Sequence, residues 1–445
     1  MLMASEAELE EVFRLAEAAS ISGIVADVGD RLASSWLAVS RFREVQALTD
    51  RSLQVQTSPS TLLYAGRAFS ATGNPTAALT YHQQALTLSQ KVGDRASEAA
   101  AFNNIGGIHG NRGELPAALT HHQQALTLCR EVGDRAGEAA TLNNIGGIHY
   151  YRGELPAALT HYQRTLTIRQ EVGDRAGEAT TLNNIGGVHH SRGDLPAALT
   201  HYQQALTIRQ EVGDRAGEAT TLSNIGSVHH DRGDLPAALT HYQQALPFFR
   251  ETGDRAGEAT TLNNIGGIHQ GRGDLPAALT HYRQALTLHR EVGDRAGEAT
   301  TLNNIGSIHH DRGDLPAALT HLQQALTLHR EVGDRAGEAT TLNNIGSIHR
   351  RRGELPAALT HYRQALTLHQ RTGNRAGEAT TRYNIAMVNR ADGNLTAAVT
   401  ELEHVVTIDQ AIQHPDLAND TATLNQVQAE LRAQLPSATS NETED

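Results

Sequence analysis

A period of 40 residues dominates the sequence from Gly93 to Thr372. Seven blocks of that length follow one another, and block 173–212 is identical to block 293–332 at 33 of 40 positions. Self-similarity at a fixed period is the signature of stacked repeats, in which one small unit buries its apolar face only against its neighbours. The chain is therefore expected to be a tandem array, and its function is sought in a surface.

Each block contains two helical patterns separated by an Arg-Gly-Asp or Arg-Gly-Glu step. Both patterns place their apolar or small residues on one helix face, so the two stripes are expected to face each other. The first stripe of the unit 133–172 consists of Leu142, Ile145, Gly146 and His149. The second stripe consists of Leu155, Ala158, Leu159, Tyr162, Leu166 and Ile168.

Start and stop signals stand at fixed places in each unit. Asp134 precedes the first pattern and is suited to N-cap a helix, and Gly153 follows that pattern as a C-terminal glycine. Pro156 falls in the first turn of the second pattern, where a missing N–H costs no hydrogen bond. The unit is thus predicted to be a helix-turn-helix hairpin.

This hairpin resembles the tetratricopeptide repeat motif. The residues that carry the likeness are Leu142, Ile145, Gly146, His149, Ala158, Tyr162 and the alanines Ala125 and Ala205. The 40-residue length is similar to the variant of the family found in kinesin light chains and spindle-orientation adaptors. The sequence departs from the motif where His149 stands at an aromatic position. The resemblance implies an all-α, right-handed superhelical solenoid of tandem helix-turn-helix repeats, which binds a partner in its concave groove.

The regular pattern weakens toward both ends of the chain. The predicted order is an acidic helix (1–20), a degenerate hairpin (21–56), nine repeat units (57–413, seven of them nearly identical over 93–372), a capping helix (414–435) and a disordered acidic tail (436–445). Terminal capping elements keep a solenoid soluble. Because a solenoid grows without one central core, the array is counted as a single domain.

The composition of the chain indicates its cellular compartment and excludes some classes of partner. Cys129 is the single cysteine, which excludes intramolecular disulfides and cysteine-based zinc sites and fits a reducing compartment. No run of about 18 apolar residues occurs, and the acidic start does not resemble a signal peptide, so a cytoplasmic protein without membrane contact is expected. The net charge is −12, of which residues 1–20 contribute −4 and 401–445 contribute −8. Because the remainder is neutral, nucleic acid is not an expected partner.

An asparagine ladder is the sharpest functional signal. One asparagine position recurs throughout the array, and in six of the eight units it is the second residue of an Asn-Asn doublet. Its members are Asn104, Asn144, Asn184, Asn224, Asn264, Asn304, Asn344 and Asn384. The resemblance places this position on the concave wall, where a carboxamide can both donate to and accept from the backbone of an extended peptide. The competing interpretation is that each asparagine bonds its own or a neighbouring helix and fixes only the stacking of the repeats.

Two adjacent positions at the end of each first helix vary among otherwise similar units. The specificity candidates at these positions are Tyr150, Tyr151, His190, His230, Asp231, His310, Asp311, Arg350, Arg351 and Arg390. They follow the ladder at i+6 and i+7, so at least one of each pair is expected to share its wall. Neutral drift at exposed helix ends is the alternative, although the chemistry is ordered along the chain from aromatic to imidazole to guanidinium.

Histidines invite a metal hypothesis, but most belong to two series with a period of 40 residues. One series runs from His109 to His349 at the motif's aromatic position, and the other runs from His121 to His361 in the second helix. They are interpreted as structural, and no metal or cofactor is predicted. The sequence contains no phosphate-binding loop, nucleophile elbow or His-Glu-x-x-His helix, so the chain is not expected to be an enzyme.

These observations predict a scaffold or adaptor that binds a protein or an extended peptide in its groove. Two alternatives stay open, a sensor array of a larger signalling system and a self-assembling repeat protein. The partner is expected to be acidic, or to end in a carboxylate, where it meets Arg350, Arg351 and Arg390. In the competing interpretation these arginines pair with the protein's own C-terminal acids, namely Asp416, Asp420 or the tail Glu442–Asp445.

Overall fold

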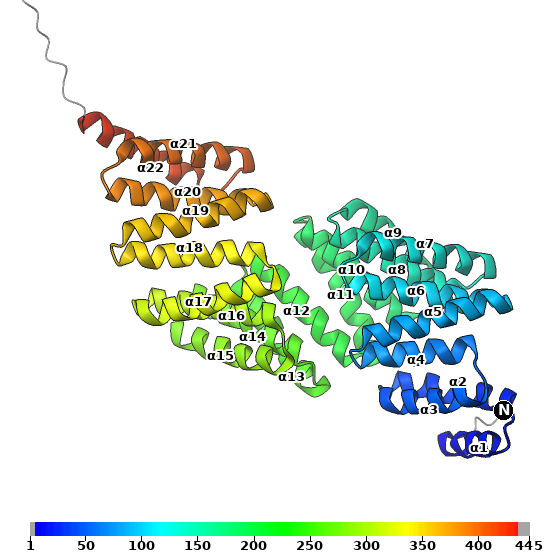
Figure 1. The fold of residues 1–445 in the computed structure, drawn as a ribbon. Coiled ribbons are helices and arrows are strands. Elements are labelled where there is room, and N and C mark those ends of the chain that lie inside the picture. The colour runs from blue at the N-terminus through cyan, green and yellow to red at the C-terminus, as the bar shows by residue number, and fades with distance from the viewer. Residues whose placement is uncertain (1–4, 435–445) are drawn as a thin grey trace, which may run out of the picture. The chain divides into compact units, whose positions relative to one another are not determined.

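The computed structural model describes residues 5–434, and all regular structure in that range is helical (Figure 1). Helical hairpins follow one another along the chain, so the predicted all-α fold of tandem helix-turn-helix repeats is confirmed. The described chain divides between Val228 and His229 into two compact parts. The predicted disordered tail, 436–445, lies outside the described residues.

Nine hairpins form the array, and we call the two helices of each hairpin its first helix and its second helix. The first helices are α4 (Pro59–Ala71), α6 (Arg95–Asn111), α8 (Arg135–Tyr151), α10 (Arg175–Ser191), α12 (Arg215–Asp231), α14 (Arg255–Gly271), α16 (Arg295–Asp311), α18 (Arg335–Arg351) and α20 (Arg375–Ala391). The second helices are α5 (Pro75–Val92), α7 (Leu115–Val132), α9 (Leu155–Val172), α11 (Leu195–Val212), α13 (Leu235–Thr252), α15 (Leu275–Val292), α17 (Leu315–Val332), α19 (Leu355–Thr372) and α21 (Leu395–Ile412). The array is preceded by α1 (Glu6–Ala18), α2 (Ser22–Ala38) and α3 (Phe42–Val55), and it is followed by α22 (Leu417–Gln434).

Caps begin and end the helices where the sequence predicts them. The carboxylate of Asp134 accepts a hydrogen bond of 2.9 Å from the backbone N–H of Gly137 and thereby caps α8. Gly153 has a φ of +73°, a left-handed conformation that ends the helical run and that glycine adopts without strain. Pro156 lies in the first turn of α9. The predicted start and stop signals of the hairpin are confirmed.

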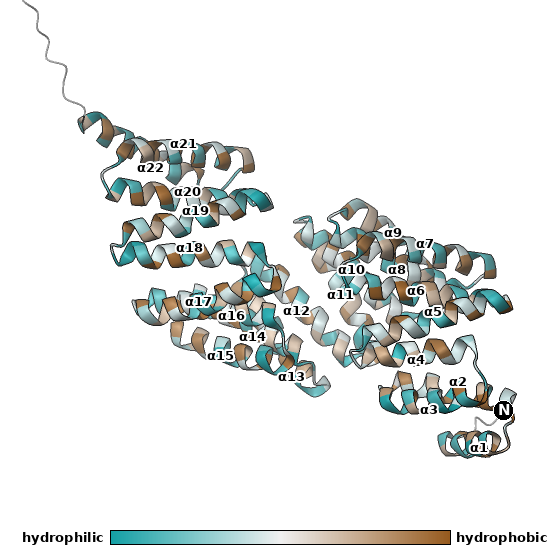
Figure 2. Ribbon diagram, in the orientation of Figure 1, coloured by the Kyte–Doolittle hydropathy of each residue, from teal (hydrophilic) through white to brown (hydrophobic). Residues whose placement is uncertain are grey.

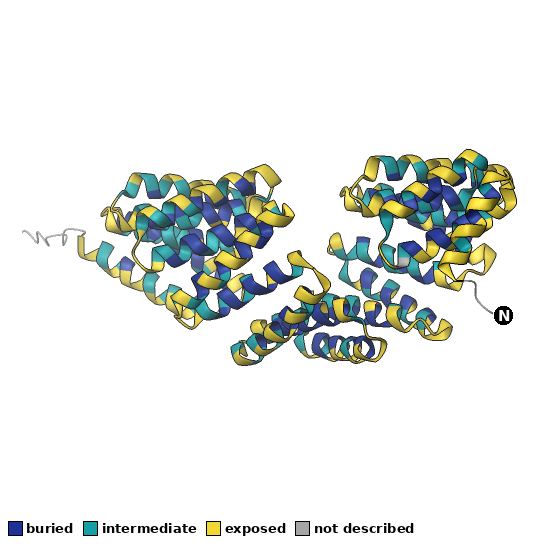
Figure 3. Ribbon diagram, turned by 90° about the horizontal axis from the view of Figure 1, so that it is seen from below, coloured by how far each residue is buried: buried dark blue, intermediate teal, exposed yellow. Residues whose placement is uncertain are grey.

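The core of each hairpin depends on a close approach between its two helices. Gly146 in α8 faces the ring of Tyr162 in α9, and a Cβ atom at Gly146 would lie only 2.8 Å from that ring. Tyr162 is buried in this contact, and Leu142 and Ile145 of the first predicted stripe are buried as well. The other residues of the two predicted stripes are buried or half-buried. Figure 2 shows the hydrophobic residues, and Figure 3 the buried ones, on the helix sides that face neighbouring helices.

A buried glutamate joins each unit to its neighbour. Glu138 near the start of α8 is 3% exposed, and it accepts hydrogen bonds from Arg130 of the preceding unit (2.9 Å) and from Arg135 (2.6 Å). Arg135 also pairs with Glu171 at the end of α9. The same arrangement recurs around Glu298. Because a buried carboxylate is costly unless it is paired, these arginines hold the units in register with one another.

First helices of successive units contact each other. This holds for α4 with α6, α6 with α8, α14 with α16, α16 with α18 and α18 with α20. We call the surface formed by the first helices, which carries the Asn doublets, the first-helix face. None of the helices in the described range combines the length and apolar character that crossing a bilayer requires.

Candidate peptide-binding site

Carboxamides on the first-helix face are linked from one unit to the next. In each link, Nδ2 of a ladder asparagine donates to Oδ1 of the first asparagine of the doublet in the preceding unit, over 3.0 to 3.2 Å. The pairs are Asn144 with Asn103, Asn184 with Asn143, Asn224 with Asn183, Asn304 with Asn263, Asn344 with Asn303 and Asn384 with Asn343. The ladder asparagines therefore bond the neighbouring helix, which is the contact expected from the stacking interpretation.

The stacking bonds leave part of each carboxamide unused. The Oδ1 atom of Asn303 accepts from Asn344 and also from the hydroxyl of Thr341 at 3.1 Å. Among the described residues, neither Oδ1 of Asn304 nor Nδ2 of Asn303 takes part in a side-chain hydrogen bond. Both residues are half-buried, and neither of these two atoms is fully buried. Each doublet thus offers one acceptor and one amide donor to a ligand while its other atoms fix the stacking.

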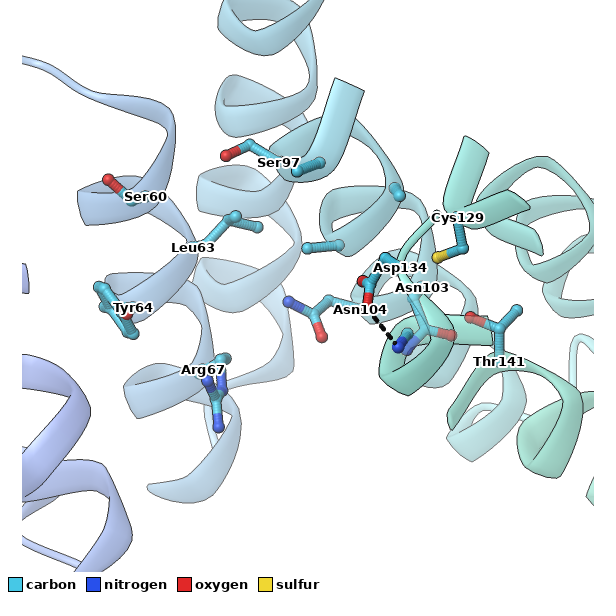
Figure 4. Close-up of a pocket in the computed structure, with 14 residues that line it drawn as sticks. Ser60, Leu63, Tyr64, Arg67, Ser97, Asn103, Asn104, Cys129, Asp134 and Thr141 are labelled. Atoms are coloured by element: carbon cyan, nitrogen blue, oxygen red, sulfur yellow. Dashed lines mark hydrogen bonds between the residues drawn. The ribbon is translucent and has the colours of Figure 1, made fainter. Parts of the chain in front are cut away.

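A cleft opens on the first-helix face near the start of the array (Figure 4). Its volume is about 490 Å³, and its walls come from α4, α6 and α8 with one residue from α7. On the α4 side Figure 4 shows Ser60, Leu63, Tyr64 and Arg67. The opposite side carries Cys129, Asp134 and Thr141, and Asn103 and Asn104 lie between the two sides. The asparagine doublet of α6 therefore lines a real depression.

At the ends of some first helices, a residue at a variable position contacts a variable position of the adjacent unit. The Tyr150 hydroxyl lies 2.8 Å from the Ser191 hydroxyl, and the Arg351 guanidinium donates to the His310 carbonyl oxygen at 2.7 Å. Tyr151 extends away from the fold and is 79% exposed. Within each compact part, the structure thus brings some of these positions of adjacent units into contact. That these positions determine specificity stays a prediction.

The three arginines expected to meet an acidic partner have different surroundings. Arg390 makes two hydrogen bonds to Glu430 of α22, at 3.0 and 2.5 Å. Glu430 is a C-terminal acid that the sequence interpretation does not name. Arg351 is held at the His310 carbonyl oxygen, and Arg350 lies near Tyr362. An intramolecular partner thus already satisfies Arg390.

Asp420, one of the C-terminal acids considered as a partner of these arginines, lies in an acidic cluster instead. Burial, and next the neighbouring Asp409 and Asp416 carboxylates, raise the pKa of Asp420 to about 6. His414, in the loop before α22, lies 3.8 Å from Asp416 and acts in the opposite direction. No arginine pairs with Asp420 in the described part of the chain.

The two histidine series meet as stacked pairs, one pair in each of seven units. Their ring centroids lie 5.0 to 5.3 Å apart. In the unit 133–172, Nδ1 of His149 is 2.5 Å from a Glu154 oxygen, and its ring stacks on His161. Burial, and next the adjacent imidazole, lower the pKa of His161. No group of three ligand-type residues suited to a metal ion occurs within residues 5–434.

Sequence reasoning missed a second variable position, which lies near the end of each second helix against the next first helix. We call it the floor position. Its occupants are Ser89, Cys129, Arg169, Arg209, Phe249, His289, His329, His369 and Asp409. From Cys129 to His369 the occupant lies against a glycine eight residues further on, where a Cβ atom would collide with it. Comparing the repeats with each other column by column would have revealed this position.

Comparisons with known proteins agree with this architecture. The family model of the tetratricopeptide repeat matches residues 57–131, 97–171, 177–251, 257–331 and 337–411. No sequence among the curated proteins matches the chain.

Solved structures show the same fold at low sequence identity. A signal transduction ATPase with a tetratricopeptide repeat sensor, from Pyrococcus horikoshii, is 13% identical over 87% of this chain and 55% of that one, with a TM-score of 0.55. Aspartyl phosphate phosphatase F from Bacillus subtilis is 12% identical over 83% of this chain and 96% of that one, with a TM-score of 0.53. The apo form of RapI is 15% identical over 62% of this chain and 99% of that one, with a TM-score of 0.51. Because the family model covers well over half of the sequence and the hairpins carry its glycine and tyrosine contacts, the chain belongs to the tetratricopeptide repeat family.

Proposed function

We propose that the chain is a non-enzymatic adaptor that binds an extended peptide segment of a partner protein across its first-helix face. Tetratricopeptide repeat proteins generally mediate protein interactions. The observation that carries the proposal is the row of half-buried doublets, each with an unused acceptor and an unused amide donor. Those two groups match the N–H and C=O groups of an extended backbone.

Stacking and peptide binding use different atoms of the same side chains. The bond between Asn344 and Asn303 orients both carboxamides, because it joins Nδ2 of one to Oδ1 of the other. An oriented carboxamide loses less side-chain entropy when a ligand binds than a freely rotating one does. The ladder would therefore form hydrogen bonds with the backbone of a partner peptide and contribute affinity with little preference for the peptide sequence.

The test replaces Asn224, Asn264 and Asn304 together with alanine. The probe is a peptide selected from a random 12-residue display library on the full chain, and fluorescence anisotropy measures its affinity. At about 1 kcal/mol for each lost hydrogen bond, three losses should weaken binding by about 3 kcal/mol. Unchanged affinity with unchanged helicity would rule out the ladder as a binding element.

A matched control separates binding from stacking. Thr221, Thr301 and Thr341 are fully buried, and each donates to the same asparagine oxygen that receives the stacking bond. Changing these three threonines to valine weakens the stacking contacts but leaves every carboxamide in place. The valine variant is expected to bind the peptide as the parent chain does. An equal loss of affinity in both triple variants would assign the ladder to stacking alone.

A sensor array in a larger signalling system is the second candidate function. It draws support from the fold likeness to the signal transduction ATPase with a tetratricopeptide repeat sensor. A sensor would use the same first-helix face and pass the signal to an effector domain. Self-assembly remains a third hypothesis, and light scattering that rises with protein concentration would favour it over a monomeric adaptor.

A further inference from the structure

Because the units are nearly identical, the carboxamide ladder alone does not fix the position of a bound peptide along the array. The units between 133 and 372 present nearly the same surface every 40 residues. A peptide held only by their carboxamides loses little free energy when it shifts along the face by one unit, because every lost hydrogen bond is replaced by an equivalent one. A fixed register therefore needs a place where the repetition is broken. This argument rests on the function proposed above.

The cleft at α4, α6 and α8 is such a place. Its α4 wall has Leu63 and Tyr64 at the positions that are Asn103 and Asn104 one unit later. Arg67 stands where the next unit has Gly107. Polar carboxamides are thus replaced by an apolar and an aromatic side chain, with a cation beside them.

The floor position explains why this place is hollow. Cys129 is a small side chain that lines the cleft, opposite Gly137. Three units later the equivalent space is filled by Phe249, which packs against Gly257 and is buried. Arginine or histidine fills it in the other uniform units. The cleft exists because its floor residue is small while the glycine opposite is retained.

The charges around the cleft favour a ligand with an anionic group near Arg67. Arg67 is exposed, and no ion pair to it occurs among the described residues. Asp134, on the opposite side, has one carboxylate oxygen engaged in the cap of α8. An anionic group of a ligand would find its counter-ion at Arg67, and an apolar side chain would find its contacts at Leu63, Tyr64 and the small residues of α6.

We propose that this cleft is the register anchor of the array. It accepts one large apolar side chain of the partner peptide over Cys129, and Arg67 pairs with a carboxylate of a neighbouring peptide residue. The carboxamide ladder then holds the rest of the peptide, whose position is set by the anchored residue.

The test fills the cleft with a side chain that already occurs at the equivalent position of another unit. Cys129→Phe copies the side chain of Phe249 into a unit that has the same glycine opposite. The matched control, Cys129→Ser, copies Ser89 and keeps the cleft open. Peptides selected from the random 12-residue library on the full parent chain are synthesised with a fluorophore and one terminal photo-crosslinking group. Affinity is read by anisotropy, and register is read by mapping the crosslinked units.

The anchor predicts that the parent chain and the serine variant are crosslinked in one unit. Cys129→Phe should lower affinity about tenfold or more, because filling the pocket removes its contacts with a buried anchor side chain, and should spread the crosslinks over several units. Arg67→Gln should weaken only peptides that carry a carboxylate. Thermal unfolding monitored by circular dichroism checks that the phenylalanine variant is folded.

Two outcomes overturn the proposal in distinguishable ways. If Cys129→Phe leaves affinity and the crosslink map unchanged while replacing Asn104, Asn144 and Asn184, the ladder residues nearest the cleft in sequence, with alanine weakens binding, the anchor is wrong and the adaptor function stands. If the library yields no binder, or this asparagine variant binds unchanged, the proposed function itself fails.

Discussion

The uniform units between 133 and 372 and the two units before them solve the same packing problem with different residues. In the uniform unit 253–292, Gly266 faces Tyr282, whereas His122 occupies that place in the unit 93–132 and faces Gly106. The floor position holds Phe249 in one region and Cys129 in the other.

The comparison distinguishes the residues that build every hairpin from the residues that differ between units. Gly66, Gly106 and Gly266 occupy the same position in both regions and set the approach of the two helices in each hairpin. The buried glutamate recurs from Glu98 onward, whereas Ser58 stands in its place in the first unit. The side chains that differ change the cleft volume, the charge and the titration of the first-helix face without changing the hairpin. The early units therefore differ from the uniform ones in the shape and charge of their surface while they keep the same hairpin.

The largest effect is expected at the tyrosine that fills the hairpin of a uniform unit. Tyr282 is 2% exposed, and its change to alanine leaves a cavity against Gly266, which should cost about 3–5 kcal/mol of unfolding free energy. Tyr282→Leu is the matched control, because Leu322 fills the same place opposite Gly306. Urea unfolding followed by circular dichroism measures both. Equal losses in the two variants would show that volume at this position is not what holds the hairpin.

The next effect is acid sensitivity, which should be concentrated in the early units. Burial lowers the pKa of His82 and of His122 to about 4, from an ordinary value near 6.5. The unfolded chain therefore takes up these protons first as the pH falls. Unfolding free energy should be at its full value above about pH 7 and should fall by about 3 kcal/mol for each histidine between pH 6.5 and 4.

The control for this prediction is His122→Tyr, which copies Tyr162 into a hairpin that has the same glycine opposite. Stability is measured by urea unfolding at intervals between pH 7.5 and 4. The variant should lose the share of the pH dependence that His122 contributes. The second-helix histidines of the stacked pairs, such as His161, should still cause a smaller decrease in unfolding free energy as the pH falls. Burial and the adjacent imidazole lower their pKa as well. If the pH dependence of unfolding free energy is the same in the variant as in the parent chain, His122 does not contribute to it.

The smallest effect is expected at the arginines of the unit 333–372. Arg350 and Arg351 remain candidates for an acidic partner, whereas Arg390 is already paired with Glu430. Changing Arg350 and Arg351 to glutamate should slow association with an acidic library peptide and flatten its dependence on salt, since steering by exposed charge is screened by ions. Stopped-flow association rates at several salt concentrations provide the measurement. Identical rates and salt slopes would remove these arginines from the binding surface.

Much of the fold could be predicted because the repeat multiplies each local signal. Asp134 caps α8 and Gly153 ends it as the sequence indicates, since caps depend on residues close to them in the chain. The stacking bond between Asn144 and Asn103 spans 41 residues, so its geometry could not be deduced from either helix alone. The sequence is consistent with both interpretations of the ladder, and only the three-dimensional structure shows that, within the described part of the chain, the stacking bonds leave Oδ1 of Asn304 and Nδ2 of Asn303 without a side-chain partner.

The cleft escaped prediction for a related reason. Cys129 was considered only as a redox residue, and its small size matters only because Leu63 and Tyr64 of another unit lie across from it. The pairing of Arg390 with Glu430 likewise depends on how α22 packs on α20. Features that join separate units depend on the tilt of one hairpin on the next, which the 40-residue pattern does not encode in any single position.

The most direct test of the central claim is a crystal structure of the full chain with a library-selected peptide. The account predicts that the peptide lies extended on the first-helix face, with its backbone N–H and C=O groups about 2.9 Å from the free carboxamide atoms of successive doublets. The bonds between Asn344 and Asn303 and between their equivalents should remain in place. A peptide bound on the second helices, or on the first-helix face without contact to the asparagines, would contradict the account.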